Sequence, residues 1–331
     1  MKRLGLIELA AIAGVSISTV SRALSDHPRV SAATKARIRE LAVEHGFRLN
    51  QTASALRRKR TGAIGVVIPL GHDVDQSLSD PFFMGLLGPI ADALARAGYD
   101  LLLSRVIPDG DDWLDDIVAA GRVDGVIVIG QSDQTDTIET VARRFAPIVV
   151  WGAHRPGMAQ VTVGSDNRRG GELAARHLIA SGRRRLAFLG DPAVPEFADR
   201  HAGFHAVIAR TPDVEETVLP MHLTERDAYS ETARYLATQT WPNGIFAASD
   251  VIAMSAMRAV IDRGLRVPQD VSVIGYDDIS LAAHTAPPLT TVRQNVARGA
   301  TLLVELLLQR IAGEPAASVA MPPELILRAS A

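Results

Sequence analysis

The sequence predicts a small all-α head followed by a larger α/β body made of two lobes with parallel sheets. Three short helical patterns fill the first 45 residues. From Thr61 onward, short apolar runs alternate with helical patterns, and such alternation produces parallel sheets with right-handed crossovers. The alternation occurs in two successive stretches of similar length. We therefore expect two doubly wound lobes with a cleft between them, where open α/β sheets bind ligands.

Composition separates the head from the body. The first 60 residues carry 12 Lys and Arg against four acidic residues, a net charge of +8, whereas the remainder carries 23 basic and 33 acidic residues, a net charge of −10. A basic head on an acidic body indicates that the head binds a polyanion. The chain has no cysteine, which excludes disulfides, zinc fingers and thiol chemistry.

The head has the pattern of a helix-turn-helix domain. Its helices are expected at 6–13, 17–24 and 32–45. Ser16 and Ser31 are placed to cap the second and third helices, and Gly46 can end the third with a positive φ. Ala10 allows close helix approach, and Gly14 supplies the tight turn.

The second predicted helix has two different sides. With about 3.6 residues per turn, one side packs and the other is exposed. The packing side contains Val20 and Ala23, and the exposed side contains Ile17, Ser18, Ser21 and Arg22. Arginine pairs with guanine, hydroxyls pair with several base acceptors, and apolar groups contact the thymine methyl. A generic helical bundle with a solvated polar side is the alternative, and the basic charge of the head favours DNA binding.

The start "MKRLGLIELAAIAG" also has the outline of an export signal, a charged segment followed by an apolar one. Glu8 interrupts the apolar run, and no small-x-small cleavage site precedes an obvious mature start. No stretch approaches the roughly 20 apolar residues of a transmembrane helix. We therefore expect neither export nor membrane insertion.

Three further patterns carry less weight. His201 and His205 are spaced to bind a metal from one helical face, but no third ligand is evident, so we expect a surface or packing role. The acidic segment Asp109–Asp116 lacks EF-hand spacing and fits a helix start. The main nucleotide-binding and hydrolase motifs are absent. We expect no catalytic residue, no metal site and no cofactor.

An ordered series of motifs resembles the lactose-repressor/galactose-repressor (LacI/GalR) family of regulators over nearly the whole chain. The motifs are "LAAIAGVSISTVSRALSDHPRVS", "GFRLNQTASALR", "TGAIGVVIP", "DPFF", "VDGVIV", "DNRRGGELAARHLIASGRRRLAFLGD", "SDVIAMSAMRAV", "VSVIGYDDI" and "PPLTTVRQ". The resemblance implies a periplasmic-binding-protein-like body. It implies a DNA-binding domain at 1–49, a hinge helix or linker at 50–61, a first lobe from 62–164 and 292–322, and a second lobe from 165–291 and 323–331.

The resemblance also assigns DNA contacts. Base-reading positions are Ile17, Ser18 and Arg22, and positions expected to contact phosphates are Ser16, Thr19, Ser21, Ser31 and Thr34. In the family the hinge folds on DNA, and paired leucines enter the minor groove; the matching hinge residues are Asn50, Ala53, Leu56 and Arg57. An apolar Leu56 among polar and basic neighbours suits that role. From the residues alone, a linker leucine packed on the body is the alternative.

The effector-binding positions implied by the resemblance are Asp80, Phe82, Phe83, Trp151, Arg200, Ser249, Asp250 and Asp277. Ser249 replaces the common Asn, which puts its direct contact in question. Simple packing is the alternative for Phe82, Phe83 and Trp151. A guanidinium, carboxylates and aromatic rings together suit a polyhydroxylated ligand, so we expect a sugar.

We therefore expect a cytoplasmic, nucleoid-associated homodimer that binds double-stranded operator DNA and represses transcription under control of a small effector. A dimer is expected rather than a tetramer because no leucine heptads follow "PELILRA". Three alternatives stay open: a regulator corepressed by a purine or another metabolite, a sugar-binding protein without a regulatory role, and a carbohydrate-processing enzyme.

Overall fold

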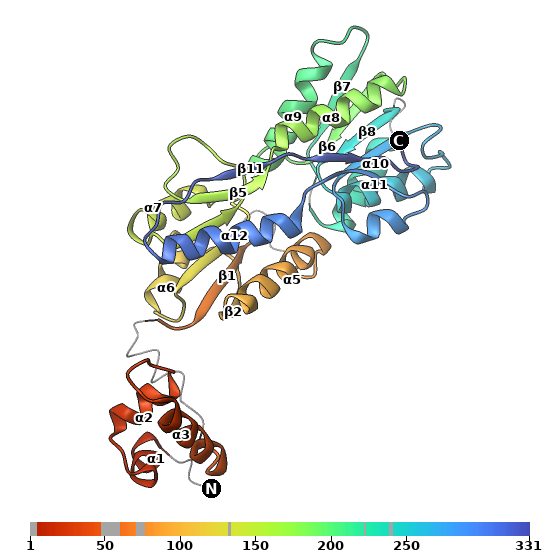
Figure 1. The fold of residues 1–331 in the computed structure, drawn as a ribbon. Helices are drawn as coiled ribbons and strands as arrows, with labels where there is room; N and C mark the ends of the chain where they lie inside the picture. Colours follow the sequence, from red (N-terminus) through yellow and green to blue (C-terminus); the bar gives the residue numbers. More distant parts are fainter. Residues whose placement is uncertain (1–4, 48–59, 71–76, 132–133, 222, 238–240) are drawn as a thin grey trace. The chain divides into compact units, whose positions relative to one another are not determined.

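Figure 1 shows the fold of the chain in a computed structural model. The structure describes residues 5–47, 60–70, 77–131, 134–221, 223–237 and 241–331. The chain divides into two compact units, Met1–Thr61, which contains the head, and Gly62–Ala331, the body.

The head is a three-helix domain. Its helices are α1 (Leu6–Ala13), α2 (Ile17–Leu24) and α3 (Ala32–Glu44), at the positions that the capping residues predicted. Gly14 ends α1 with a φ of 66°, in the left-handed region that glycine adopts at least cost. Leu9, Val20 and Ile38 form the centre of a buried apolar cluster. One residue from each helix thus holds the three helices together.

The turn between α1 and α2 has the geometry of a helix-turn-helix. The two helices are bent by 99°, within the range of roughly 90–120° usual for this motif. In the part of the chain that the structure describes, no single helix is long and apolar enough to cross a membrane. The pair α1 and α2 passes that test only if its bend is ignored, by length and composition.

The first lobe has a six-stranded parallel sheet in the order β2-β1-β3-β4-β5-β11. Its strands are β1 (Ala63–Pro69), β2 (Asp100–Val106), β3 (Gly125–Ile129), β4 (Ile148–Trp151), β5 (Val161–Ser165) and β11 (Val319–Met321). Its helices are α5 (Pro81–Arg96), α6 (Trp113–Ala119), α7 (Thr135–Arg144) and α12 (Val296–Ile311). α5 and α12 pack in one apolar cluster, and α6 and α7 in another, so both faces of the sheet are covered.

The second lobe repeats this arrangement with the strand order β7-β6-β8-β9-β10-β12. Its strands are β6 (Arg185–Leu189), β7 (Glu215–Leu219), β8 (Gly244–Ala247), β9 (Ser272–Asp277), β10 (Thr290–Arg293) and β12 (Glu324–Ile326). Its helices are α8 (Asn167–Ala180), α9 (Pro195–Ile208), α10 (Glu225–Leu236), α11 (Asp250–Asp262) and the short 3-10 helix η1 (Ser280–His284). The antiparallel pair β10–β12 is an exception in this otherwise parallel sheet. The helical head and the two parallel-sheet lobes confirm the predicted fold class.

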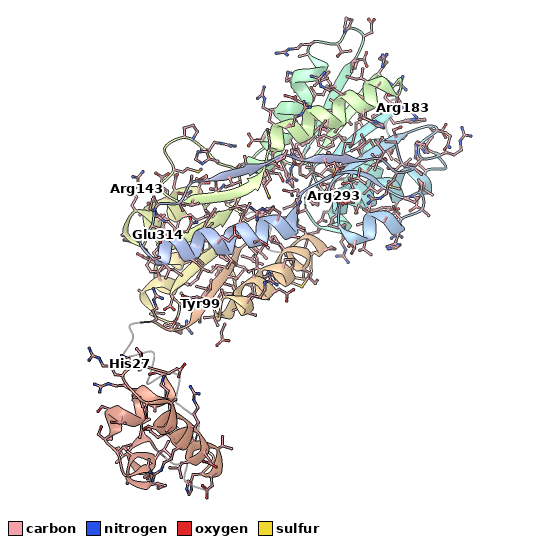
Figure 2. All side chains as sticks on the ribbon, in the orientation of Figure 1. His27, Tyr99, Arg143, Arg183, Arg293 and Glu314 are labelled. Atoms are coloured by element: carbon pink, nitrogen blue, oxygen red, sulfur yellow. The ribbon has the colours of Figure 1, made fainter. Side chains whose placement is uncertain are left out.

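The chain passes between the lobes at three short connections: from β5 to α8, from β10 to α12 and from β11 to β12. β11–β12 lies between the other two, because Met321 pairs with Ser165 and Glu324 pairs with Arg293. Arg293, labelled in Figure 2, is the last residue of β10. The expected start of the first-lobe return at residue 292 is therefore two residues early, since Val292 still pairs with Tyr276 of β9.

Both sheets reverse their strand order beside the first strand of the lobe, between β1 and β3 and between β6 and β8. Ligands of open parallel sheets bind at such a switch point, outside the carboxyl ends of the strands. The two lobes together therefore offer two switch points.

Candidate functional site

The exposed side of α2 is the candidate DNA-recognition surface of the head. Ile17, Ser18 and Arg22 are exposed, and the Ile17 side chain keeps 40% of its surface accessible despite being apolar. Val20 and Ala23, on the other side of α2, are buried in the head core. The helix thus has one packed side and one exposed side, and the exposed side combines an apolar group, a hydroxyl and a guanidinium.

Hydroxyl groups surround the N-terminus of α2. The Ser16 Oγ accepts a hydrogen bond from the Thr19 backbone N–H at 3.1 Å, and it lies 2.8 Å from the hydroxyls of Ser18 and Thr19. Ser21 is half-buried one turn further along. A capped, exposed helix N-terminus directs backbone N–H groups and a partial positive charge outward, which suits phosphate binding.

The N-terminus of α3 is built in the same way. The Ser31 Oγ accepts from the Thr34 N–H at 3.2 Å and lies 2.8 Å from the Thr34 Oγ1. Lys35 and Arg39 of α3 both contact the Asp26 carboxylate at 3.0 Å. These two cations lower the pKa of Asp26 and fix the loop that joins α2 to α3. The predicted hinge residues Asn50, Ala53, Leu56 and Arg57 lie outside the described residues.

A cavity of about 780 Å³, counted with its open mouth, lies between the two lobes at the carboxyl ends of their strands. The first lobe contributes Pro69, Leu70, Asp80, Phe82, Phe83, Ile129, Gly130 and Trp151 to its lining. The second lobe and the connection after β10 contribute Val194, Glu196, Phe197, Arg200, Leu223, Ser249, Val251, Asp277 and Gln294. Seven of the eight predicted effector residues lie here together; Asp250 does not.

The first-lobe wall is largely aromatic. Phe82 is half-buried, with its ring centroid 5.9 Å from that of Phe83 and 6.1 Å from that of Trp151. Asp80 caps α5 and accepts from the Phe82 N–H at 2.8 Å, which sets the position of both phenylalanines. Trp151 also packs closely on Gly299 of α12. Phe83 and Trp151 therefore serve the core and the cavity at once, so packing and lining are not exclusive alternatives.

Arg200 is the cation of the second-lobe wall and is only 5% exposed. Its Nε donates to the Asn167 Oδ1 at 2.9 Å, and its Nη1 donates to the Ala248 carbonyl. Its guanidinium lies 3.7 Å from the ring centroid of Tyr276 and 5.2 Å from that of Phe197. These contacts hold the guanidinium in one place, as a preorganised binding group requires.

The closeness of α8 and α9 is what brings Arg200 to this position. Gly171 of α8 lies against the Arg200 carbonyl, and Gly203 of α9 lies against the Arg168 carbonyl. A Cβ at either glycine would overlap the opposing backbone. Both glycines are thus needed for the close helix pair, and the pair fixes the cation at the cavity.

Asp277 is the carboxylate of the second-lobe wall. It ends β9 with a φ of 118°, a backbone conformation that costs a non-glycine residue free energy and often marks a functional site. Its Oδ1 accepts from the Gln294 Nε2 at 2.7 Å. Burial raises the pKa of Asp277 to about 7, although Arg200 and the Gln294 hydrogen bond act to lower it. Its carboxyl group can therefore act as a donor or an acceptor near neutral pH.

Asp250 departs from its predicted role. It is fully buried and does not line the cavity; its Oδ1 accepts from the Thr291 hydroxyl at 2.5 Å and its Oδ2 accepts from the Ile279 N–H at 2.9 Å. Burial, followed by the charge of Asp277, raises the pKa of Asp250 well above its usual value. It supports the loop after β9 instead of facing a ligand. Its neighbour Ser249 does line the cavity, and its Oγ caps α11 by accepting from the Ile252 N–H at 3.3 Å.

Several lining residues carry no assignment from the sequence, above all Glu196, Phe197 and Gln294. The Glu196 Oε1 accepts a hydrogen bond from the Ala153 N–H at 3.2 Å, which links the second lobe to the first. The Arg155 guanidinium and the Asp199 carboxylate make a second link at 2.9 Å. Pro195 at the first turn of α9 indicated a helix start here, but the sequence gave no signal that this start faces the other lobe.

The fold and the two surfaces define a class of protein, a helix-turn-helix DNA-binding head joined to a two-lobed ligand-binding body. Residues 6–50 match the family described as bacterial regulatory proteins, lacI family, and residues 175–331 match the periplasmic binding protein-like domain.

Full-length comparisons give the same assignment. The chain is 30% identical over 335 residues to the HTH-type transcriptional regulator DegA of Bacillus subtilis (strain 168), which covers 98% of this chain and 97% of DegA. It is similar to a crystal structure of the lac repressor dimer bound to operator and the anti-inducer ONPF, with a TM-score of 0.87, 26% identity and 99% of each chain covered. It is also similar to a complex of the transcriptional regulator CelR with cellobiose, with a TM-score of 0.71, 27% identity and 99% and 100% of the two chains covered. The chain belongs to the lacI family of bacterial regulatory proteins.

The chain is therefore a DNA-binding transcriptional regulator. This confirms the predicted class of function. The open alternatives of a carbohydrate-processing enzyme and of a binding protein without a regulatory role are not what the family contains.

Proposed function

We propose that this regulator binds a pseudopalindromic operator through α2 and represses transcription until a sugar binds between its lobes. The exposed side of α2 carries the proposal for DNA. Ile17, Ser18 and Arg22 contact base edges in the major groove, and phosphates are contacted by Ser16, Thr19, Ser21, Ser31 and Thr34. Base contacts select the sequence, and phosphate contacts set the position of the head.

The hinge provides a second contact with DNA in this proposal. Asn50, Ala53, Leu56 and Arg57 fold on the operator, and Leu56 enters the minor groove beside its counterpart from the partner. The run of basic residues from Arg57 to Arg60 supports phosphate contacts next to that leucine. As a DNA-bound regulator, the protein acts in the cytoplasm at the nucleoid.

A homodimer follows from this mode of binding, because a two-fold protein matches a two-fold operator. The body has an apolar region suited to self-association. Strand β2 lies at the edge of the first sheet and exposes Leu102 and Leu103, and Met84 of α5 is exposed as well. The lac repressor to which the chain is similar is a dimer on its operator.

The effector proposal depends mainly on the arrangement of Arg200 and Asp277 across from Phe82 and Trp151. A fixed cation, a carboxyl group and the Gln294 amide can hydrogen-bond several hydroxyls, and aromatic rings pack on the apolar face of a sugar ring. CelR, which resembles this chain along its full length, binds cellobiose. We therefore propose a sugar, with a disaccharide or glucoside as the first class to test.

Induction is the proposed sign of the response. Sugar binding favours one lobe arrangement over the other, and it weakens DNA binding only by the difference in its affinity for those two arrangements. The contacts Ala153–Glu196 and Arg155–Asp199 cross between the lobes and are the contacts most directly altered by such a change.

The test of DNA recognition uses DNA enriched from a random pool by the wild-type protein. Arg22→Ala should reduce the preference for enriched over scrambled DNA by a factor corresponding to about 1–3 kcal/mol. Arg37→Ala removes the same charge from an exposed position of α3 and should weaken binding to both DNAs equally. An unchanged preference in Arg22→Ala would refute the recognition-helix assignment.

The test of the effector is a thermal-shift screen against disaccharides, glucosides, monosaccharides and purines, since a ligand of the folded state raises Tm. A stabilising sugar should release the enriched DNA in a fluorescence anisotropy titration. Stabilisation by a purine alone, with tighter DNA binding, would replace the proposal by corepression.

A further inference from the structure

A cluster of three side chains lies on the outer side of α9, away from the cavity-lining contacts. His201 and His205 are one helical turn apart, and Glu216 lies on the adjacent strand β7. The His201 Nε2 is 3.0 Å from the Glu216 Oε1, and the His205 Nδ1 is 2.5 Å from the Glu216 Oε2. The sequence showed the histidine pair but no third partner; the fold supplies it from the next strand.

The donor atoms converge as metal ligands do. The candidate ligand atoms of the three residues all lie within 4.8 Å of one another. Ligand atoms bonded tetrahedrally to zinc at about 2.1 Å lie about 3.4 Å apart, so small side-chain rotations suffice. Among the described residues, this is the one group of three or more histidine and acidic side chains with such convergence.

The surroundings of the cluster suit an ion that exchanges with solvent. The Glu216 side chain is only 12% exposed, whereas that of His205 is 58% exposed and leaves an open approach. The His201 ring packs on Phe188 at a centroid distance of 5.0 Å, which limits its rotation. One side of the site is thus fixed by the core, and the other can be completed by water.

We propose that His201, His205 and Glu216 bind a divalent transition-metal ion of the zinc type, with water completing the coordination. Two imidazoles and one carboxylate are the protein ligands of several open zinc sites, and imidazole donors favour zinc, nickel and copper over magnesium and calcium. The site is separate from the effector cavity, which α9 lines with Phe197 and Arg200.

The ionisation of Glu216 is consistent with this role. Burial acts to raise its pKa, but the hydrogen bonds and charges of the two histidines outweigh burial, and the pKa is lowered overall. The carboxylate is therefore ionised at neutral pH and available to a cation. An ion bound here ties α9 to β7, and it would stabilise the second lobe because a ligand of the folded state raises its stability.

Direct titration of zinc into the full-length, untagged, chelator-treated protein tests the proposal. We expect saturable binding of one zinc ion per chain, a higher Tm with zinc, and no such effects with magnesium. Affinity should fall as the pH is lowered from about 8 to about 6, because protons compete for the imidazoles. Absence of saturable zinc binding, or equal binding of magnesium, would overturn the proposal.

Variants locate the ion. His205→Ala and Glu216→Gln should each weaken zinc binding by more than roughly 10-fold, since each removes a ligand. His284→Ala removes an exposed histidine elsewhere in the second lobe and should leave zinc binding unchanged. Circular dichroism and the Tm without metal check folding, and Glu216→Gln preserves side-chain size. Equal zinc affinity in the wild type, His205→Ala and Glu216→Gln would contradict the assignment.

Discussion

The two lobes of the body differ in what they contribute to the cavity, although their sheets have the same strand order. The first lobe contributes aromatic rings, from Phe82, Phe83 and Trp151, and the second contributes charged groups, from Arg200 and Asp277. Apolar area gives affinity with little discrimination, whereas a fixed polar group rejects ligands that leave it unpaired. We infer that the first lobe supplies general affinity for a sugar ring and the second selects among sugars.

Removal of the second-lobe cation should have the largest effect. Arg200→Ala leaves the buried Asp277 without its cation, and breaking a buried charge pair costs about 3–5 kcal/mol. We expect a lower free energy of unfolding in urea and no calorimetric binding of the sugar found in the screen, with DNA binding retained. Arg176→Ala, an exposed arginine of α8, is the control. If Arg200→Ala still responds to the sugar, the cation is not part of the binding site.

The buried carboxyl of the same wall should give a pH dependence. The folded-state pKa of Asp277 is raised to about 7, well above the unfolded value, so the folded state holds its proton more tightly. Its contribution to stability is therefore present at low pH and is lost as the pH rises from about 4 to about 7. The stability difference between the wild type and Asp277→Asn should fall by at least about 1 kcal/mol over that range, because one pKa unit is about 1.4 kcal/mol. Urea midpoints at several pH values measure it; a difference independent of pH would contradict the raised pKa.

The first-lobe wall should show the opposite behaviour. Phe82→Ala removes a half-buried ring and should weaken all sugars that bind by a similar amount, about 1–2 kcal/mol, without changing their order of affinity. Isothermal titration of the sugars found in the screen tests this. Phe82→Leu keeps most of the apolar area and serves as the matched variant. A changed order of affinity in Phe82→Ala would show that the aromatic wall also selects.

The contact between the lobes should give the smallest effect. Arg155 and Asp199 are partly exposed, and exposed ion pairs contribute about 0–1 kcal/mol. Asp199→Ala should change sugar affinity by less than about fivefold. A double-mutant cycle with Arg155→Ala isolates the pair. A coupling energy well above about 1 kcal/mol would make this ion pair a main determinant of lobe closure.

Local signals in the sequence predicted the elements well. Ser16 and Ser31 marked two helix starts that the structure places at the same residues. The apolar runs marked most strands of both sheets, but the alternation did not mark β5, a five-residue strand that contains Gly164. Nor did periodicity indicate that α12 packs on the first lobe; that expectation came only from the family resemblance. Which lobe a segment joins depends on contacts distant in sequence, and periodicity does not carry that information.

The candidate sites show the same limit. Asp250 and Asp277 are both acidic residues near strand ends, but only Asp277 faces the cavity, because Thr291 and Ile279 take both oxygens of Asp250. Glu216 was not recognised as a partner of His201 and His205, since the pairing depends on β7 lying beside α9. Residue type and local spacing identified candidates, and the tertiary fold decided their roles.

The three connections between the lobes, with β11–β12 bonded to a neighbour at each end, restrict the motion that a ligand can cause. Bending across all three leaves the pairs Met321–Ser165 and Glu324–Arg293 intact, whereas twisting one lobe against the other would shear them. The body therefore resembles a door with one axis more than a ball joint. Whatever molecule enters the cavity, its presence reaches the rest of the protein as a single opening angle.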